Sequence, residues 1–304
     1  MVKRSDAFKG YFFAILATIA FSNVYIFSKA ALNEVHLAQF GVYWFFISTV
    51  LSLGYAFWNN KLKQLYSLTK RQVHILITLG FLEIFTTTTF FLSINIIPDP
   101  AVTSFLGNLF PVMLAVGGVV VLGEKFGPVE TGGAVLALVG AFVISYTGET
   151  SLKKFFIPGT GIVVLNAFFA TTASLVVKTN VRKLSPELLG LNRSVWLLVF
   201  SFIMIFVYGK SFVIPVSALK NIAVGAALGP FLAVLTVYYS FSYINASRSS
   251  VVQSLKGIFV LLGAYLVFGS FPLPHQFVGG LITVAGVLVM TLGQAGVFNL
   301  RRGK

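Results

Sequence analysis

The chain has 304 residues, of which 57% are hydrophobic and only 10% are charged. Soluble domains carry about 25% charged residues, so this balance, with a mean hydropathy of +0.91, excludes a pair of soluble domains and predicts a polytopic membrane protein. The net charge of +14 does not indicate nucleic-acid binding, because the basic residues lie in short segments between apolar runs. There is no cysteine, which excludes disulfides, thiolate catalysis and zinc–cysteine sites.

The first apolar run, Gly10–Ala31, follows basic residues as the apolar core of a signal peptide does. Such a core has only 7–15 residues, whereas this run has about 20 and lacks a clear small-residue cleavage site. We therefore expect it to be a retained transmembrane helix.

Ten apolar runs approach the length of about 20 residues that a helix needs to cross a bilayer. They are Gly10–Ala31, Ala38–Trp58, Val73–Ile94, Pro100–Leu122, Pro128–Thr147, Pro158–Val177, Leu188–Tyr208, Ile222–Tyr243, Ser247–Phe268 and Pro274–Gln294. We expect an all-α polytopic membrane protein with ten transmembrane helices.

Two sets of residues recur at nearly constant spacing, which indicates a duplicated unit. Gly123, Pro128, Gly133 and Gly140 lie 146 positions before Gly269, Pro274, Gly279 and Gly286. Gly10 and Lys29 lie 149 positions before Gly159 and Lys178. We predict two repeats, 1–150 and 151–304, with five helices each. Because five is odd, the second repeat enters the membrane from the opposite side, as inverted repeats of transporters do.

The basic residues are distributed unequally between the two sides of this topology. Fifteen fall on the side of the termini and five on the other, with Arg193 and Lys256 set aside as intramembrane. Cytoplasmic loops carry the excess of Lys and Arg. Both termini are therefore expected in the cytoplasm, and a bacterial inner membrane is the expected location.

One stretch of the first half carries a family resemblance. The motif residues are Ala101 through Asn108, Pro111, Leu122-Gly123-Glu124, Gly133 and Gly140. They resemble the C-terminal part of an EamA-type repeat, and Arg193, seven residues after Pro186, matches an arginine often seen in the second helix of such a repeat. The chain is thus similar to EamA-type permeases of the drug/metabolite transporter superfamily.

The resemblance implies a ten-helix bundle with a central cavity, lined by the first, third and fourth helices of each repeat. It does not fix the substrate, because members carry amino acids, nucleotide precursors, sugar phosphates, quaternary amines or drugs. Trp44 departs from the pattern at the position equivalent to Arg193, Ser270 at the position matching Glu124, and Gly257 at the position of Pro111.

Three charged residues are predicted inside the bilayer, where a charge costs at least about 3 kcal/mol on insertion scales. Glu83 and Lys256 lie near the middle of the third and ninth runs. We interpret them as a midplane pair or as two ends of a substrate site, and a purely structural salt bridge is the alternative. Arg193 lies nearer a helix end, where a structural role by snorkelling or by donation to carbonyls is favoured.

Polar residues at helical spacing mark the helices expected to face the cavity, since polar stripes avoid lipid. The predicted binding residues besides Lys256 and Glu83 are Ser22, Tyr25, Thr87, Asn108, Asn166, Thr171, Ser174, Tyr239 and Gln253. Lys29 and Lys178 lie on the same stripes but near helix ends, where interfacial snorkelling is the expectation. Gly133, Gly140, Gly279 and Gly286 are predicted to let membrane helices pack closely.

The leading hypothesis is a secondary transporter of a small polar metabolite, with amino acid export as the first choice and Glu83 as a possible site of proton coupling. Exchange of anionic, phosphorylated or nucleotide-like metabolites, and carriage of quaternary amines or drugs, are the alternatives. A membrane-embedded enzyme is disfavoured, because His36, His74 and His275 have no metal-ligand spacing. No Walker A sequence occurs, and neither a cofactor, a metal nor nucleic acid is expected as a partner.

Overall fold

The computed structural model describes residues 4–122, 127–148, 156–181, 183–244, 249, 252–253 and 255–294. Over these residues the chain forms helices joined by turns, with an isolated β-bridge between Tyr146 and Phe156. Gly123 and Glu124 of the family motif lie outside the described residues.

The first half contains six α-helices and one short 3-10 helix among the described residues. Their bounds are α1 Arg4–Leu32, α2 Leu37–Trp58, η1 Lys61–Ser67, α3 Lys70–Ile96, α4 Pro100–Leu106, α5 Leu109–Leu122 and α6 Pro128–Ser145. Polar side chains begin several of these helices: His36, Thr69 and Asp99 accept hydrogen bonds from the first free N–H groups of α2, α3 and α4.

The second half has the corresponding helices among its described residues. Their bounds are α7 Thr160–Asn180, α8 Pro186–Val207, α9 Val216–Ala226, η2 Ala227–Ala233, α10 Val234–Tyr243, α12 Lys256–Phe268 and α13 Pro274–Gln294. Proline stands in the first turn of α4, α6 and α8, where its missing N–H is not needed.

Two of the predicted spans are interrupted. The run Pro100–Leu122 was expected as one helix, but it breaks at Gly107–Asn108 into α4 and α5. The eighth run is helical throughout, yet its middle, η2, is a π-helix that contains Pro230. A proline cannot donate its backbone hydrogen bond, and a π-turn accommodates the loss without ending the helix.

Eight helical segments of the described chain are long and apolar enough to cross a membrane. The ninth and tenth predicted runs contain shorter apolar helices, Lys256–Phe268 and Pro274–Met290, within the described residues. The chain is thus a polytopic all-helical membrane protein, and the count of ten remains a prediction.

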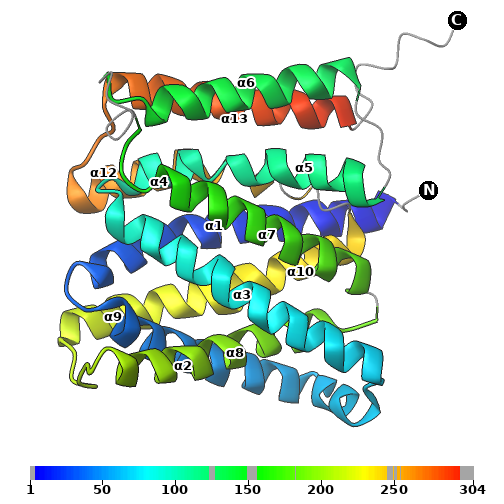
Figure 1. The fold of residues 1–304 in the computed structure, drawn as a ribbon. Coiled ribbons are helices and arrows are strands. Elements are labelled where there is room, and N and C mark those ends of the chain that lie inside the picture. The colour runs from blue at the N-terminus through cyan, green and yellow to red at the C-terminus, as the bar shows by residue number, and fades with distance from the viewer. Residues whose placement is uncertain are drawn as a thin grey trace, which may run out of the picture.

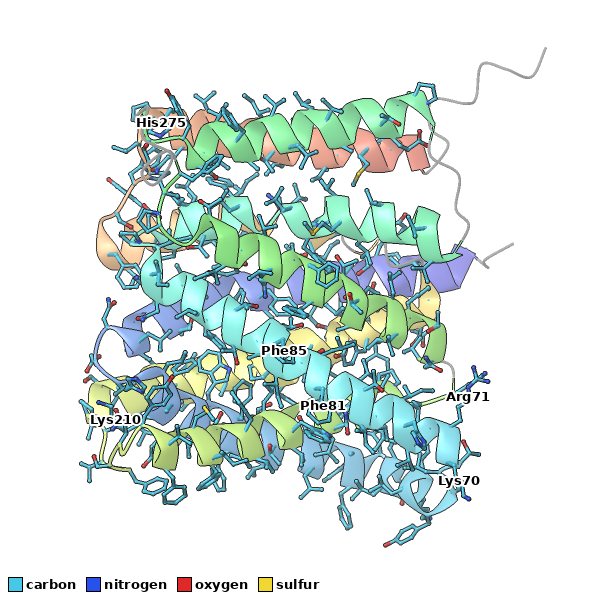
Figure 2. The ribbon with its side chains drawn as sticks, in the orientation of Figure 1. Lys70, Arg71, Phe81, Phe85, Lys210 and His275 are labelled. Atoms are coloured by element: carbon cyan, nitrogen blue, oxygen red, sulfur yellow. The ribbon has the colours of Figure 1, made fainter. Side chains whose placement is uncertain are left out.

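The helices form an antiparallel bundle (Figure 1). Helix α6 lies along α13 at one edge of the bundle, α2 lies along α8 at the other, and α1, α3, α7 and α10 lie between these pairs. Lys70 and Arg71 lie at one end of the bundle, and Lys210 and His275 lie at the opposite end (Figure 2). Large apolar side chains such as Phe81 and Phe85 are half exposed on the outside, as a lipid-facing surface requires.

Glycine makes the contact between α6 and α13 possible. A Cβ atom on Gly133 would lie 2.3 Å from the backbone nitrogen of Met290, and one on Gly140 would lie 2.5 Å from that of Thr283. On α13, a Cβ on Gly286 would lie 2.3 Å from the backbone nitrogen of Ala137. A Cβ on Gly279 would lie 2.8 Å from the carbonyl oxygen of Gly140 on α6. These four glycines therefore occupy the close-packed line that their predicted role requires.

A central cavity with three charged side chains

A cavity of about 170 Å³ lies in the middle of the bundle. Side chains of α1, α3, α7, α10 and the start of α12 line it, together with Gly107 and Phe110 at the break of the fourth run. These are the six helices that the family resemblance implied. Trp44 and Phe45 of α2 and Arg193 of α8 also line it, which the resemblance did not imply. The volume is below the ~300–1,000 Å³ of pockets for drug-sized ligands, so in this state the cavity suits a small molecule.

Seven of the predicted binding residues meet in this cavity. They are Lys256, Glu83, Tyr25, Thr87, Asn166, Ser174 and Gln253. Tyr25 and Ser174 come from helices in different halves of the sequence, and both face the same space.

Four predicted binding residues do not line the central cavity. The Ser22 hydroxyl donates to the carbonyl of Thr18 at 2.7 Å, within its own helix. The Tyr239 hydroxyl donates to Oε1 of Glu187 at 2.5 Å. Asn108 and Thr171 are buried elsewhere, and their side-chain polar atoms have no hydrogen-bond partner among the described residues. Helical spacing alone therefore did not decide which polar residues reach the cavity wall.

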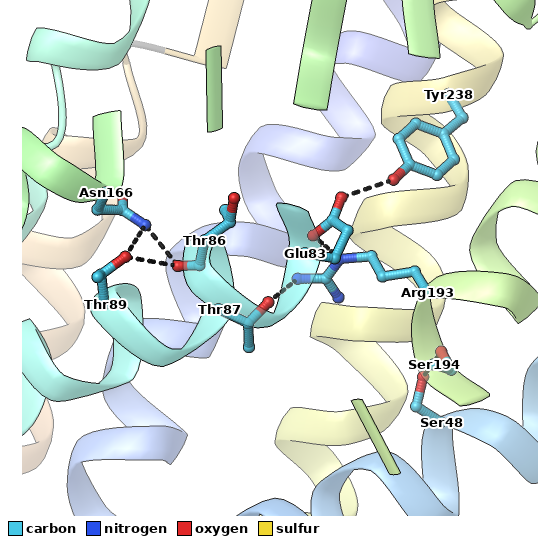
Figure 3. A network of polar contacts seen from close by, with 9 residues as sticks. All are labelled: Ser48, Glu83, Thr86, Thr87, Thr89, Asn166, Arg193, Ser194 and Tyr238. Carbon is cyan, nitrogen blue, oxygen red and sulfur yellow. Dashed lines mark hydrogen bonds and ion pairs between the residues drawn. The ribbon is translucent and has the colours of Figure 1, made fainter. Parts of the chain in front are cut away.

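The prediction that Glu83 and Lys256 form a pair is wrong, because Glu83 pairs with Arg193. Nε of Arg193 lies 2.7 Å from Oε2 of Glu83, and both side chains are largely buried. Nη2 of Arg193 donates to Oγ1 of Thr87 at 2.8 Å, and the Tyr238 hydroxyl donates to Oε1 of Glu83 at 3.3 Å. Figure 3 shows this network between α3, α8 and α10. Arg193 therefore points into the bundle rather than snorkelling to the surface.

A second polar contact holds α7 against α3. Nδ2 of Asn166 donates to the carbonyl of Thr86 at 2.7 Å, and it lies 3.4 Å from Oγ1 of Thr89 (Figure 3). The Thr89 hydroxyl donates back to the carbonyl of Phe85 at 2.7 Å, which is the local bond expected of an intramembrane threonine.

Lys256 has no carboxylate of the described chain within ion-pair distance of its Nζ. Its Nζ lies over the Tyr25 ring, 6.0 Å from the centroid. Lys256 is also the first residue of α12, whose N-terminus has no side-chain cap. The backbone N–H of Ile258 in its first turn donates to the carbonyl of Leu255 at 3.1 Å, and the positive end of the helix dipole adds to the ammonium charge.

The charges on the cavity wall do not cancel. Glu83 and Arg193 neutralise each other, which leaves the charge of Lys256 in excess among the described lining residues. Within the described chain no group of three His, Cys, Asp or Glu residues could hold a metal ion. The arrangement can bind an anionic group.

A membrane-embedded helical bundle with a charged cavity at its centre is an architecture that transporters use. The EamA-like transporter family model matches residues 8–146 and 157–292. The chain therefore belongs to the EamA-like transporter family, and the resemblance to EamA-type permeases of the drug/metabolite transporter superfamily is confirmed.

Two further comparisons add the fold but no substrate. A solved structure titled "Crystal structure of protein" is 17% identical, with a TM-score of 0.67, and the match covers 96% of this chain and 98% of that one. At this identity the likeness concerns the fold alone. A search of curated proteins finds no match.

Proposed function

We propose that this transporter carries a small metabolite with a carboxylate through the central cavity by alternating access, without a cofactor. The observation that supports the proposal is the charge of Lys256, which has no carboxylate partner among the described residues and lies at the first residue of α12, beside a cavity of about 170 Å³. The ammonium and the positive end of the helix dipole together favour an anion.

Amino acids are the first class to test, and export is the proposed direction. The carboxylate would contact Lys256, and the amide oxygens of Asn166 and Gln253 could accept hydrogen bonds from the amino group. Glu83 supports an amino group less well than the sequence suggested, because Arg193 already occupies its Oε2. Small phosphorylated anions are the second class. Quaternary amines are disfavoured by the excess positive charge.

We also propose that the two halves are inverted repeats with both termini in the cytoplasm. Two contacts and one shared cavity support the symmetry: Gly133 lies against Gly286, Gly140 lies against Gly279, and Tyr25 and Ser174 line the same cavity. The repeat spacing of 146 residues relates Gly133 to Gly279 and Gly140 to Gly286, so it converts the first glycine pair into the second. The excess of basic residues at the end bearing Lys70 and Arg71 supports the orientation.

The substrate is best identified by a thermal-shift screen of the purified protein, because a ligand that binds the folded state raises its apparent stability. The screen would compare amino acids, short carboxylates, phosphorylated metabolites and quaternary amines. A shift with carboxylates supports the proposal, and a shift confined to quaternary amines contradicts it.

The role of Lys256 is tested by transport of the identified ligand into reconstituted vesicles. Lys256→Gln should weaken binding roughly 10- to 150-fold, the equivalent of losing a charge-assisted hydrogen bond of about 1.5–3 kcal/mol. The fold should persist, since no carboxylate of the described chain loses a partner. The matched control is Lys220→Gln on the exposed face of α9. Transport by Lys256→Gln at the parent rate would overturn the assignment.

Proton coupling is tested in the same vesicles by comparing the pH dependence of transport by Glu83→Gln with that of the parent.

A further inference from the structure

A second cavity, of about 380 Å³, lies between α2, α3 and α8. Its outer end is at the bundle end where His36 precedes α2 and Tyr208 follows α8, with the two ring centroids 4.9 Å apart. Its inner end reaches Thr87. Thr87 lies nine residues before the end of α3, or about 14 Å along the axis at 1.5 Å per residue. The second cavity therefore leads from one end of the bundle into its interior.

The two cavities have a common wall. Phe45, Thr87 and Phe91 line both of them. Since one side chain contacts both spaces, the wall at these positions is a single side chain thick. Both phenylalanines are buried, and they lie between two cavities that are separate in this structure.

Phe91 is the centre of the ring packing that closes the wall. Its ring centroid lies 4.8 Å from that of Phe40, 5.5 Å from that of Trp44, 6.4 Å from that of Phe45 and 5.1 Å from that of Phe90. These contacts are made edge to face, without hydrogen bonds. A ring held in this way can change rotamer without breaking the backbone ladder of α3.

The same ring packing continues to the charged end of the central cavity. The Phe90 centroid lies 5.1 Å from that of Tyr25, and the Tyr25 ring lies below Nζ of Lys256. An anion that draws Lys256 away from Tyr25 would thus change the surroundings of the Tyr25 ring. Tyr25 packs against Phe90, and Phe90 packs against Phe91.

We propose that the transported molecule passes between the central cavity and the His36 end of the bundle through the second cavity, and that the Phe91 ring is the gate between the two. The inference rests on the proposed transport function. It defines a route between α2, α3 and α8, with Thr88 and Asn95 as polar residues along mostly apolar walls.

Cysteine accessibility tests the gate, because the chain has no cysteine of its own. Thr88→Cys reports on the second cavity, and Ser174→Cys reports on the central one. Each reporter is introduced into the parent chain and into Phe91→Ala, Phe91→Leu and Phe85→Ala. Phe85→Ala is the matched control, since it removes a ring from the same helix on the lipid-facing side, where Phe85 stacks on Phe169.

The reagent is 2-sulfonatoethyl methanethiosulfonate, an anion that does not cross membranes, applied separately to the two faces of sealed vesicles. From the His36 face, Thr88→Cys should react in every variant. From the same face, Ser174→Cys should react at least about tenfold faster in the Phe91→Ala background than in the parent. The rate with Phe91→Leu should be intermediate, and the rate with Phe85→Ala should equal that of the parent. The smaller change to Leu keeps the experiment informative if the Ala variant does not fold.

Three results would overturn the route. They are an unreactive Thr88→Cys from the His36 face, a Ser174→Cys rate that neither Phe91 variant changes, and equal acceleration by Phe85→Ala. The measurement needs no transported substrate, so it is independent of the proposed function. If the Phe91 variants expose Ser174→Cys but the protein transports nothing, the gate is supported and the transport function is rejected. If the protein transports a substrate but the Phe91 variants leave the accessibility of Ser174→Cys unchanged, the transport function is supported and the gate is rejected.

Discussion

Lys29 and Lys178 make the same kind of contact at opposite ends of the bundle. Nζ of Lys29 donates to the carbonyls of Ile94, Asn95 and Ile97 at 2.9, 3.4 and 3.1 Å, where α3 ends. Nζ of Lys178 donates to the carbonyls of Phe241 and Ile244 at 2.9 and 2.8 Å, where α10 ends.

Each lysine thus bonds the C-terminal carbonyls of a helix in its own half of the chain, and α3 and α10 end at opposite ends of the bundle (Figure 1). Carbonyls at a helix C-terminus are unpaired and carry partial negative charge, so a cation there is stabilising. The expected snorkelling of Lys29 is wrong, because this side chain is buried.

Replacing either lysine should destabilise the protein. Lys29→Met and Lys178→Met each remove charge-assisted bonds to buried carbonyls, at about 1–3 kcal/mol per variant. Thermal unfolding in detergent measures the loss, with Lys220→Met on the exposed face of α9 as the control. Equal melting temperatures for all three variants and the parent would show that the contacts contribute nothing.

Adjacent glycines on α6 should respond oppositely to alanine. A Cβ on Gly133 would overlap the backbone of α13, whereas one on Gly132 would meet nothing within 4 Å. Gly133→Ala should therefore cost about 1–3 kcal/mol by overpacking. Gly132→Ala should be neutral or stabilise by up to about 1 kcal/mol through helix propensity. The same unfolding assay compares them, and a stable Gly133→Ala would show that α6 and α13 are not in tight contact.

The Glu83–Arg193 pair should behave as one unit. Glu83→Gln or Arg193→Gln leaves the other charge buried without its partner, which costs about 3–5 kcal/mol. The double variant Glu83→Gln/Arg193→Gln should recover most of that loss. A double-mutant cycle on unfolding measures the coupling, and additive effects of the two changes would argue against a paired role.

Stability should fall in mild acid because of His36, which lies before the first residue of α2. Burial lowers the pKa of His36 below its ordinary 6.5, and repulsion from Lys210 lowers it further. The folded state therefore favours neutral imidazole, whose Nδ1 accepts from the N–H of Ala38 at 3.2 Å. The contribution of neutral His36 to the free energy of unfolding is fully present above about pH 6.5. It is lost as the pH falls through the lowered pKa of His36.

His36→Asn provides the comparison for this pH dependence, since asparagine is also a good N-cap but does not titrate. Melting temperatures between pH 8 and pH 5 should fall less for His36→Asn than for the parent. Parallel curves would mean that His36 does not contribute to the pH dependence.

The sequence predicted the helices far better than their mutual orientation. Long apolar runs and the glycine spacing were sufficient to locate the spans and the close-packed line on α6 and α13, because both depend on local composition. Depth in the membrane also identified Glu83 and Lys256 as unusual. The partner of Glu83 was missed because it depends on the rotation of α8 about its axis, and no periodicity in a single chain specifies that rotation.

The interruptions of the helices were missed for a different reason. Gly107-Asn108 and Gly229-Pro230 stand in the middle of apolar runs, and such pairs are signals of a break or a distortion. Each run is apolar over the full length of a membrane span, and this continuous apolar character favoured one unbroken helix over a break at the glycine pair. The second cavity had no signal of its own, because its walls are mostly apolar residues that only packing brings together.

The π-helical segment η2 sets the direction of every side chain that follows it in its span. A π-turn holds one residue more than an α-turn, so α10 is rotated by about 100° from where an unbroken α-helix would place it. Tyr238 faces Glu83 because of that extra residue. Deleting one residue from Ala227–Ala233 would turn Tyr238 away and leave α9 in place. The position of the π-turn in the span therefore decides which face of α10 lines the central cavity.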